Sequence, residues 1–156
     1  MEQGGLLVIV ATPVALPGVI ERRRWPVHVT VAGNFHLDAE LEDEASALLD
    51  SVASRAPAFD VILGPGDRFG AERNISVLLA EHPTFHTLHE SLAAGLRGLA
   101  GFVEAEPAFW GPGYRPHATT GPAVRARDGD ILTIRMLTLV SLDGGTGQPV
   151  RAAELP

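Results

Sequence analysis

The chain of 156 residues contains no cysteine and no lysine. The lack of cysteine excludes disulfide bonds, thiolate metal sites and cysteine nucleophiles. The lack of lysine excludes Schiff-base chemistry and the phosphate-binding lysine of a P-loop. All 12 basic residues are therefore arginine.

Long apolar runs are also missing. The longest one near the start, Leu6–Ala11, is too short to span a membrane, and it has neither the basic flank nor the cleavage site of a signal peptide. We therefore expect a cytoplasmic protein that has no membrane partner. A formal net charge of −7 argues against binding to long nucleic acid, but not against an arginine-lined pocket for one phosphate group.

The length and composition predict one globular, monomeric domain over residues 1–156. Two segments carry apolar residues at helical spacing, and the first of them has acidic residues at its N-terminal end. The remaining apolar runs are short and are bounded by glycine or proline, as is typical of strands. The expected helices are 38–54 and 84–96, and the expected strands are 6–10, 27–31, 59–63, 75–79, 102–105, 114–120, 131–142 and 149–153.

This element order indicates an α+β domain with two lobes, each an antiparallel sheet with a packed helix. Residues 13–25 are rich in proline and glycine and are expected to form a loop with a little helix. The segment GPGDRFG, residues 64–70, is expected to be a turn because it lacks the lysine and the spacing of a P-loop.

Two short motifs share the order histidine, spacer, threonine. His28 and Thr30 alternate with valines, so both side chains lie on the same face of the expected strand. His117 and Thr119 repeat this arrangement in the second half of the chain. If the two lobes are related by an approximate two-fold axis, the two pairs meet across a groove.

Two facing imidazoles suit in-line phosphodiester chemistry. One can accept a proton from the nucleophile while the other donates a proton to the leaving oxygen. Histidine can do both near neutral pH because its unperturbed pKa is about 6.5. The hydroxyls of Thr30 and Thr119 can donate hydrogen bonds to phosphate oxygens. Which histidine is the acid and which is the base stays open.

The motifs His28-Val29-Thr30-Val31 and His117-Ala118-Thr119-Thr120 resemble those of the 2H phosphoesterase superfamily, which includes 2′-5′ RNA ligase-like proteins and cyclic phosphodiesterases. The resemblance implies a bilobal fold, a reaction without a metal or other cofactor, and both histidines and both threonines in a central groove. It also implies a small substrate, a 2′,3′-cyclic phosphate or a related nucleotide or RNA-end phosphodiester.

The second motif departs from this pattern. Thr120 stands where many relatives carry a hydrophobic residue, and Gly121-Pro122 follows where a basic residue is common. Arg115, two residues before His117, is a candidate substitute anchor for phosphate. Tyr114 either stacks on a base of the substrate or closes the core.

Two alternatives remain open. The first is a module that holds a phosphorylated ligand in the same groove without turnover. The second is a metal-binding protein built on His82, His86 and His89, whose spacing can place imidazoles on one helix face, although an ordinary polar face is the simpler interpretation. The run Arg22-Arg23-Arg24 is expected to be solvated, with a role at the groove rim as the lesser option.

Overall fold

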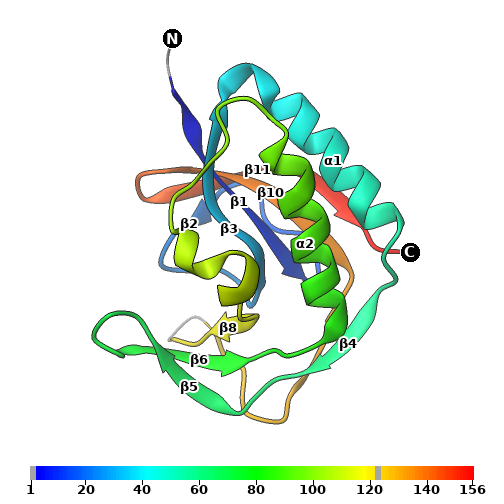
Figure 1. The fold of residues 1–156 in the computed structure, drawn as a ribbon. Coiled ribbons are helices and arrows are strands. Elements are labelled where there is room, and N and C mark those ends of the chain that lie inside the picture. The colour runs from blue at the N-terminus through cyan, green and yellow to red at the C-terminus, as the bar shows by residue number, and fades with distance from the viewer. Residues whose placement is uncertain (1–2, 122–123) are drawn as a thin grey trace.

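The computed structural model describes residues 3–121 and 124–156, so Pro122 lies outside the described residues. Its largest element is a six-stranded antiparallel sheet in the order β2-β11-β10-β1-β3-β7 (Figure 1). The strands are β1 (Gln3–Thr12), β2 (Ile20–Glu21), β3 (Val29–Asp38), β7 (Val103–Glu104), β10 (Met136–Asp143) and β11 (Thr146–Glu154).

Alternation along β1 gives this sheet two different faces. Leu7, Ile9 and Ala11 belong to the main hydrophobic core, whereas Val8 and Val10 belong to a smaller cluster. Val10 pairs with Thr30 of β3, so Thr30 shares the face of the smaller cluster. The first motif threonine therefore lies on the side of the sheet opposite the main core.

Both long helices contribute to the main core. The acidic residues of the first turn of α1 (Glu42–Ser54) suit the positive end of the helix dipole, and a short 3-10 turn, η1 (Ala39–Leu41), precedes it. His82 caps α2 (Pro83–Arg97) by accepting a hydrogen bond from the Thr84 N–H. The two helices lie beside one another on the large sheet (Figure 1).

The second motif lies on a separate small sheet. Its strands are β5 (Gly66–Phe69), β6 (Ile75–Leu79) and β8 (His117–Thr119), in the order β5-β6-β8. A two-stranded sheet joins β4 (Phe59–Ile62) to β9 (Ile131–Ile134). Between β7 and β8, two 3-10 turns, η2 (Pro107–Phe109) and η3 (Gly111–Gly113), lead into the second motif.

The structure confirms the expected α+β class with antiparallel sheets. The expectation for GPGDRFG was wrong, because residues 66–69 form β5 by pairing with β6. Residues 13–25 hold strand β2, which pairs with β11, and no helix is assigned within this described stretch. The expected strand 131–142 is divided at Arg135, whose N–H donates to the Thr12 carbonyl. Strand β2 and the division at Arg135 depend on partners that are distant in sequence, whereas β5 depends on the next strand along the chain, β6.

The turn before the second motif is closely packed, and this gives a test of the fold. A Cβ at Gly113 would overlap the backbone carbonyl of Ala108. Gly113→Ala should therefore lower the free energy of unfolding by about 1–3 kcal/mol, measured by urea denaturation. Gly18→Ala is the control, since no neighbouring atom of the described residues lies within 4 Å of its new Cβ. Equal midpoints for the two variants would contradict the close packing.

Candidate active site

His28 immediately precedes β3, in contrast to the expectation that it lies within the strand. Its Nδ1 is 2.9 Å from the carbonyl oxygen of Pro26, two residues earlier. The ring of Trp25 packs beside the imidazole with centroids 4.7 Å apart. The first histidine is thus oriented by one carbonyl and one aromatic ring.

His117, the first residue of β8, has the same kind of surroundings. Its Nδ1 is 2.8 Å from the carbonyl oxygen of Arg115, again two residues earlier. The ring of Phe69 packs against the imidazole with centroids 4.4 Å apart. The two histidines therefore share a local geometry although their strands belong to different sheets.

These contacts determine which nitrogen of each neutral ring carries the proton. A backbone carbonyl can only accept a hydrogen bond, so Nδ1 must be the donor in both rings. The neutral ring then presents Nε2 as an acceptor. Within the described residues, no hydrogen bond involves the Nε2 of His28 or of His117, so both nitrogens are available to a ligand.

Burial lowers the pKa of both histidines below the ordinary value. For His28, loss of solvent is the largest cause, the Pro26 carbonyl opposes it, and the charge of His117 lowers the pKa further. For His117, burial again dominates, the Arg115 carbonyl opposes it, and the Arg115 guanidinium adds to the lowering. Burial therefore favours the neutral form of both rings in the free protein at pH 7.

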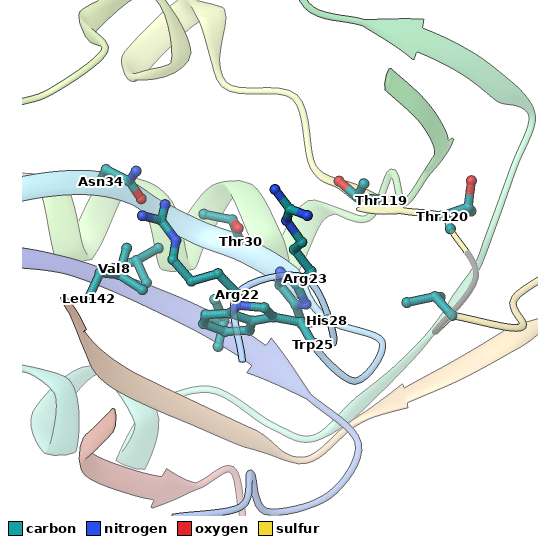
Figure 2. Close-up of a pocket in the computed structure, with 13 residues that line it drawn as sticks. Val8, Arg22, Arg23, Trp25, His28, Thr30, Asn34, Thr119, Thr120 and Leu142 are labelled. Carbon is teal, nitrogen blue, oxygen red and sulfur yellow. The ribbon is translucent and has the colours of Figure 1, made fainter. Parts of the chain in front are cut away.

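Two adjoining cavities separate the histidines. His28 lines a cavity of about 300 Å³, and His117 lines a second one of about 540 Å³. Thr30, Asn34 and Thr119 line both, so the two cavities meet between the motifs. Figure 2 shows the first cavity, with Thr30 and Thr119 approaching it from different strands.

The two threonines of the second motif differ in their contacts. The Thr120 hydroxyl donates to the Ser76 carbonyl and so helps to hold the strand end. No hydrogen bond within the described residues uses the hydroxyl of Thr30 or Thr119. The two hydroxyls that border both cavities are thus the ones available to a ligand.

Arg115 lies at the edge of the second cavity. Its guanidinium is 3.3 Å from Asp67 and lies over the ring of Phe69 at 5.0 Å from the centroid. The pKa of Asp67 is lowered, first by the Arg68 N–H and also by Arg115. Arg115 is thus placed to reach a ligand in the cavity, but it shares its charge with a carboxylate.

Tyr114 occupies the core position, one of the two roles that the sequence left open. Only 8% of its surface is exposed, and its hydroxyl donates to the Thr30 carbonyl at 2.9 Å. Burial raises the pKa of this phenol, so it stays a neutral donor. Tyr114 therefore ties the segment before the second motif to the strand of the first.

Sequence reasoning missed His89, which is buried rather than part of a polar face. Its ring stacks on Tyr114 with centroids 4.1 Å apart. The Gly111 N–H donates to Nε2, so the proton is on Nδ1, which donates to the Val31 carbonyl at 2.7 Å. His89 and Tyr114 together form a clamp between β3 and the turn before β8.

The helix histidines do not gather around a common point. His86 is paired with Glu81, and His82 caps α2, while both nitrogens of His89 are already bonded. Among residues 3–121 and 124–156, no three histidine, aspartate or glutamate side chains are grouped as a metal site would require. The metal-binding alternative therefore has no support from this helix.

Comparison with known proteins shows the family to which the chain belongs. The family model of the 2′-5′ RNA ligase superfamily matches residues 13–140, a segment that includes both motifs. The chain belongs to this superfamily. The resemblance to 2H phosphoesterases is thereby confirmed, and membership supports a phosphoesterase or RNA-ligase-like activity.

Solved structures share the fold over nearly the whole chain. TT0787 of Thermus thermophilus is 18% identical with a TM-score of 0.64, covering 96% of this chain and 97% of that one. E. coli LigT complexed with 3′-AMP is 19% identical with a TM-score of 0.61, and LigT complexed with phosphate is 17% identical with a TM-score of 0.58. Both LigT alignments cover 99% of each chain. At these identities the likeness shows the fold alone.

Among curated proteins, no match to the chain was found. No helix in the described part of the chain is both long and apolar enough to cross a membrane.

The clamp predicts a particular pH dependence of stability. Burial lowers the pKa of His89, with Arg97 and His86 adding to this, and the Val31 carbonyl and Glu90 opposing it. Protonation would also abolish the acceptor for the Gly111 N–H. The unfolded chain therefore binds the proton more readily, so stability is full above about pH 6.5 and falls below it until the folded protein is also protonated, at no more than about 1.4 kcal/mol per pH unit for this one group.

The test is urea unfolding between pH 7.5 and pH 5. His89→Gln should be less stable at pH 7.5, by about 1–3 kcal/mol, and its stability should fall less steeply in acid. Tyr114→Phe removes a donor of the same clamp without removing a histidine, so it should lose about 1 kcal/mol and keep the steep dependence. If the free energy of unfolding of His89→Gln depended on pH as steeply as that of the wild type, His89 could not be the neutral, buried histidine described here.

Proposed function

We propose that the chain is a metal-independent phosphoesterase that acts on 2′,3′-cyclic phosphates or related nucleotide and RNA-end phosphodiesters. His28 and His117 supply general acid–base catalysis, and Thr30 and Thr119 hold the phosphate. The observation that carries the proposal is the matched pair of imidazoles on either side of a cleft whose two halves share both threonines.

The proposed hydrolysis balances with these groups alone. The Nε2 of one neutral histidine accepts a proton from water as its oxygen bonds to phosphorus. The bond from phosphorus to one ribose oxygen breaks, and that oxygen takes a proton from the Nε2–H of the other, protonated histidine. In the ligase direction the two roles exchange. The backbone carbonyls of Pro26 and Arg115 keep each ring oriented throughout.

The hydroxyls of Thr30 and Thr119 are suited to the non-bridging oxygens, because they border both halves of the cleft. Arg115 supplies positive charge at the His117 end, with Asp67 fixing its position. Tyr114 acts through Thr30 as a positioning residue. The ligands 3′-AMP and phosphate found with LigT, which shares this fold, are of the kind that such a cleft accepts.

The first test is turnover of a panel of nucleoside 2′,3′-cyclic phosphates, scored for ring-opened product. His28→Ala and His117→Ala should each lower the rate by on the order of 10²–10⁴-fold, the usual contribution of one proton donor or acceptor. The double variant should lose much less than the product of the two single losses, because the pair acts as a unit. Thr30→Val and Thr119→Val should cost about ten- to a hundredfold.

His86→Ala is the control, since His86 lies on α2 and lines neither cavity. It should keep wild-type activity, and EDTA should leave the wild-type rate unchanged. Loss of activity in EDTA, or a larger loss in His86→Ala than in the motif variants, would contradict the proposal. Tight binding of the nucleotides without any product would favour the non-catalytic module.

The lowered pKa values of the two histidines predict an acidic optimum for kcat/KM. The rate falls at low pH when the base is protonated, and it falls at high pH when the acid has lost its proton. Because both groups titrate below 6.5 in the free protein, the maximum of kcat/KM should lie below about pH 6.5.

The profile of kcat should lie at higher pH than that of kcat/KM, because the bound phosphate's negative charge favours the imidazolium. Steady-state rates from pH 4.5 to 9 measure both profiles. A maximum of kcat/KM above pH 7.5 would show that the two buried histidines are not the titrating pair.

A further inference from the structure

Two arginines outside the motifs reach the cleft. Arg22 and Arg23 line the same cavity as His28 and Asn34, and Figure 2 shows both guanidinium groups extending into it from the loop before β3. Arg24 is different, since it does not line the cavity and its Nε lies 3.5 Å from the carboxylate of Glu21. The sequence RRR therefore divides into two residues at the cleft and one outside it.

The charge of Arg22 and Arg23 is not balanced within the cavity. No aspartate or glutamate is among the described residues that line it, and neither arginine forms an ion pair with a described residue. Two neighbouring guanidinium groups repel one another, so a bound anion would stabilise this arrangement. This local charge stands out in a protein whose formal net charge is −7.

Arg22 is also held in place without a ligand. Its backbone N–H donates to the Gly145 carbonyl at 2.9 Å, and its guanidinium donates to the Gly144 carbonyl at 3.1 Å. Both carbonyls belong to the turn between β10 and β11. A side chain oriented in advance loses less conformational entropy when it binds an anion.

We propose that Arg22 and Arg23 form a subsite for a second phosphate group of the substrate. This proposal rests on the proposed function, in which the reacting phosphate lies between the histidines, beside Thr30 and Thr119. The arginines line the cavity on the His28 side of that point, and the proposal places the rest of the substrate in this cavity. The preferred substrate class is then a cyclic phosphate that carries a further phosphate, either a 5′-phosphate or an internucleotide linkage.

The kinetic test compares three probes: adenosine 2′,3′-cyclic phosphate, the same nucleotide with a 5′-phosphate, and a diadenylate ending in a 2′,3′-cyclic phosphate. The wild type should prefer one or both of the probes with two phosphates by about five- to thirtyfold in kcat/KM, as expected for partly exposed arginine–phosphate pairs. Which of the two is preferred distinguishes a terminal from an internucleotide phosphate. The preference should shrink as salt is added.

The double variant Arg22→Gln/Arg23→Gln should bring the ratio between the probes to near one. Arg24→Gln, a matched change one residue away, should keep the wild-type ratio and rate. An equal kcat/KM for all three probes in the wild type would overturn the subsite, and so would a preference that survives in the double variant.

A binding experiment separates failure of the subsite from failure of the proposed catalysis. Calorimetry should show that the wild type binds adenosine 3′,5′-bisphosphate about tenfold more tightly than 3′-AMP. The double variant should bind the two nucleotides with equal affinity. If none of the cyclic probes is turned over but this difference holds, the catalytic proposal fails while the subsite stands. Equal affinities in the wild type would overturn the subsite whatever the activity.

Discussion

The arrangement of the cleft depends on the clamp that His89 and Tyr114 form between β3 and the turn before β8. A buried polar group without a partner costs free energy. Breaking the hydrogen bonds of His89 to the Val31 carbonyl and the Gly111 N–H would leave such groups without partners, so these bonds hold β3 and the turn together. Tyr114 adds a hydrogen bond to the Thr30 carbonyl, within the first motif itself. The two motifs lie on different sheets, so no ladder of strand hydrogen bonds fixes their separation. These few side-chain bonds, together with the core, do so instead.

Each of the two motif histidines is oriented by residues in direct contact with its ring. Each ring is bonded to the carbonyl two residues before it and packs on one aromatic side chain. The carbonyl selects the tautomer, and the aromatic ring contributes to the burial that lowers the pKa. Trp25 is close to His28 in sequence, whereas Phe69 reaches His117 only through the pairing of β5, β6 and β8. Similar surroundings are thus built from different chain segments.

The sequence correctly predicted the features that depend on the local spacing of apolar residues. The alternation with valines correctly indicated that Thr30 lies on the face of β3 away from the main core, and the leucine spacing predicted both helices to within a few residues. It could not predict β5, because four residues of a glycine-rich turn become a strand only beside β6. Nor could it separate buried His89 from half-buried His86, since the difference comes from the contacts of His89 with Val31 and Gly111, which are distant in the sequence. The position of Arg22 likewise depends on the distant Gly144.

Burial of the two histidines and the charges at the cleft both affect the pKa of the imidazoles. In the free protein, desolvation lowers the pKa of both rings and so favours their neutral forms, whereas the proposed reaction requires one of them to be protonated and act as the acid. An anionic phosphate between the rings favours the imidazolium and thereby helps to create that acid on binding. Arg115 works in the opposite direction at His117, because its positive charge disfavours a positive charge on that ring. A further phosphate on Arg22 and Arg23 would place more negative charge in the cavity that His28 lines, so it would also favour the protonated form of His28.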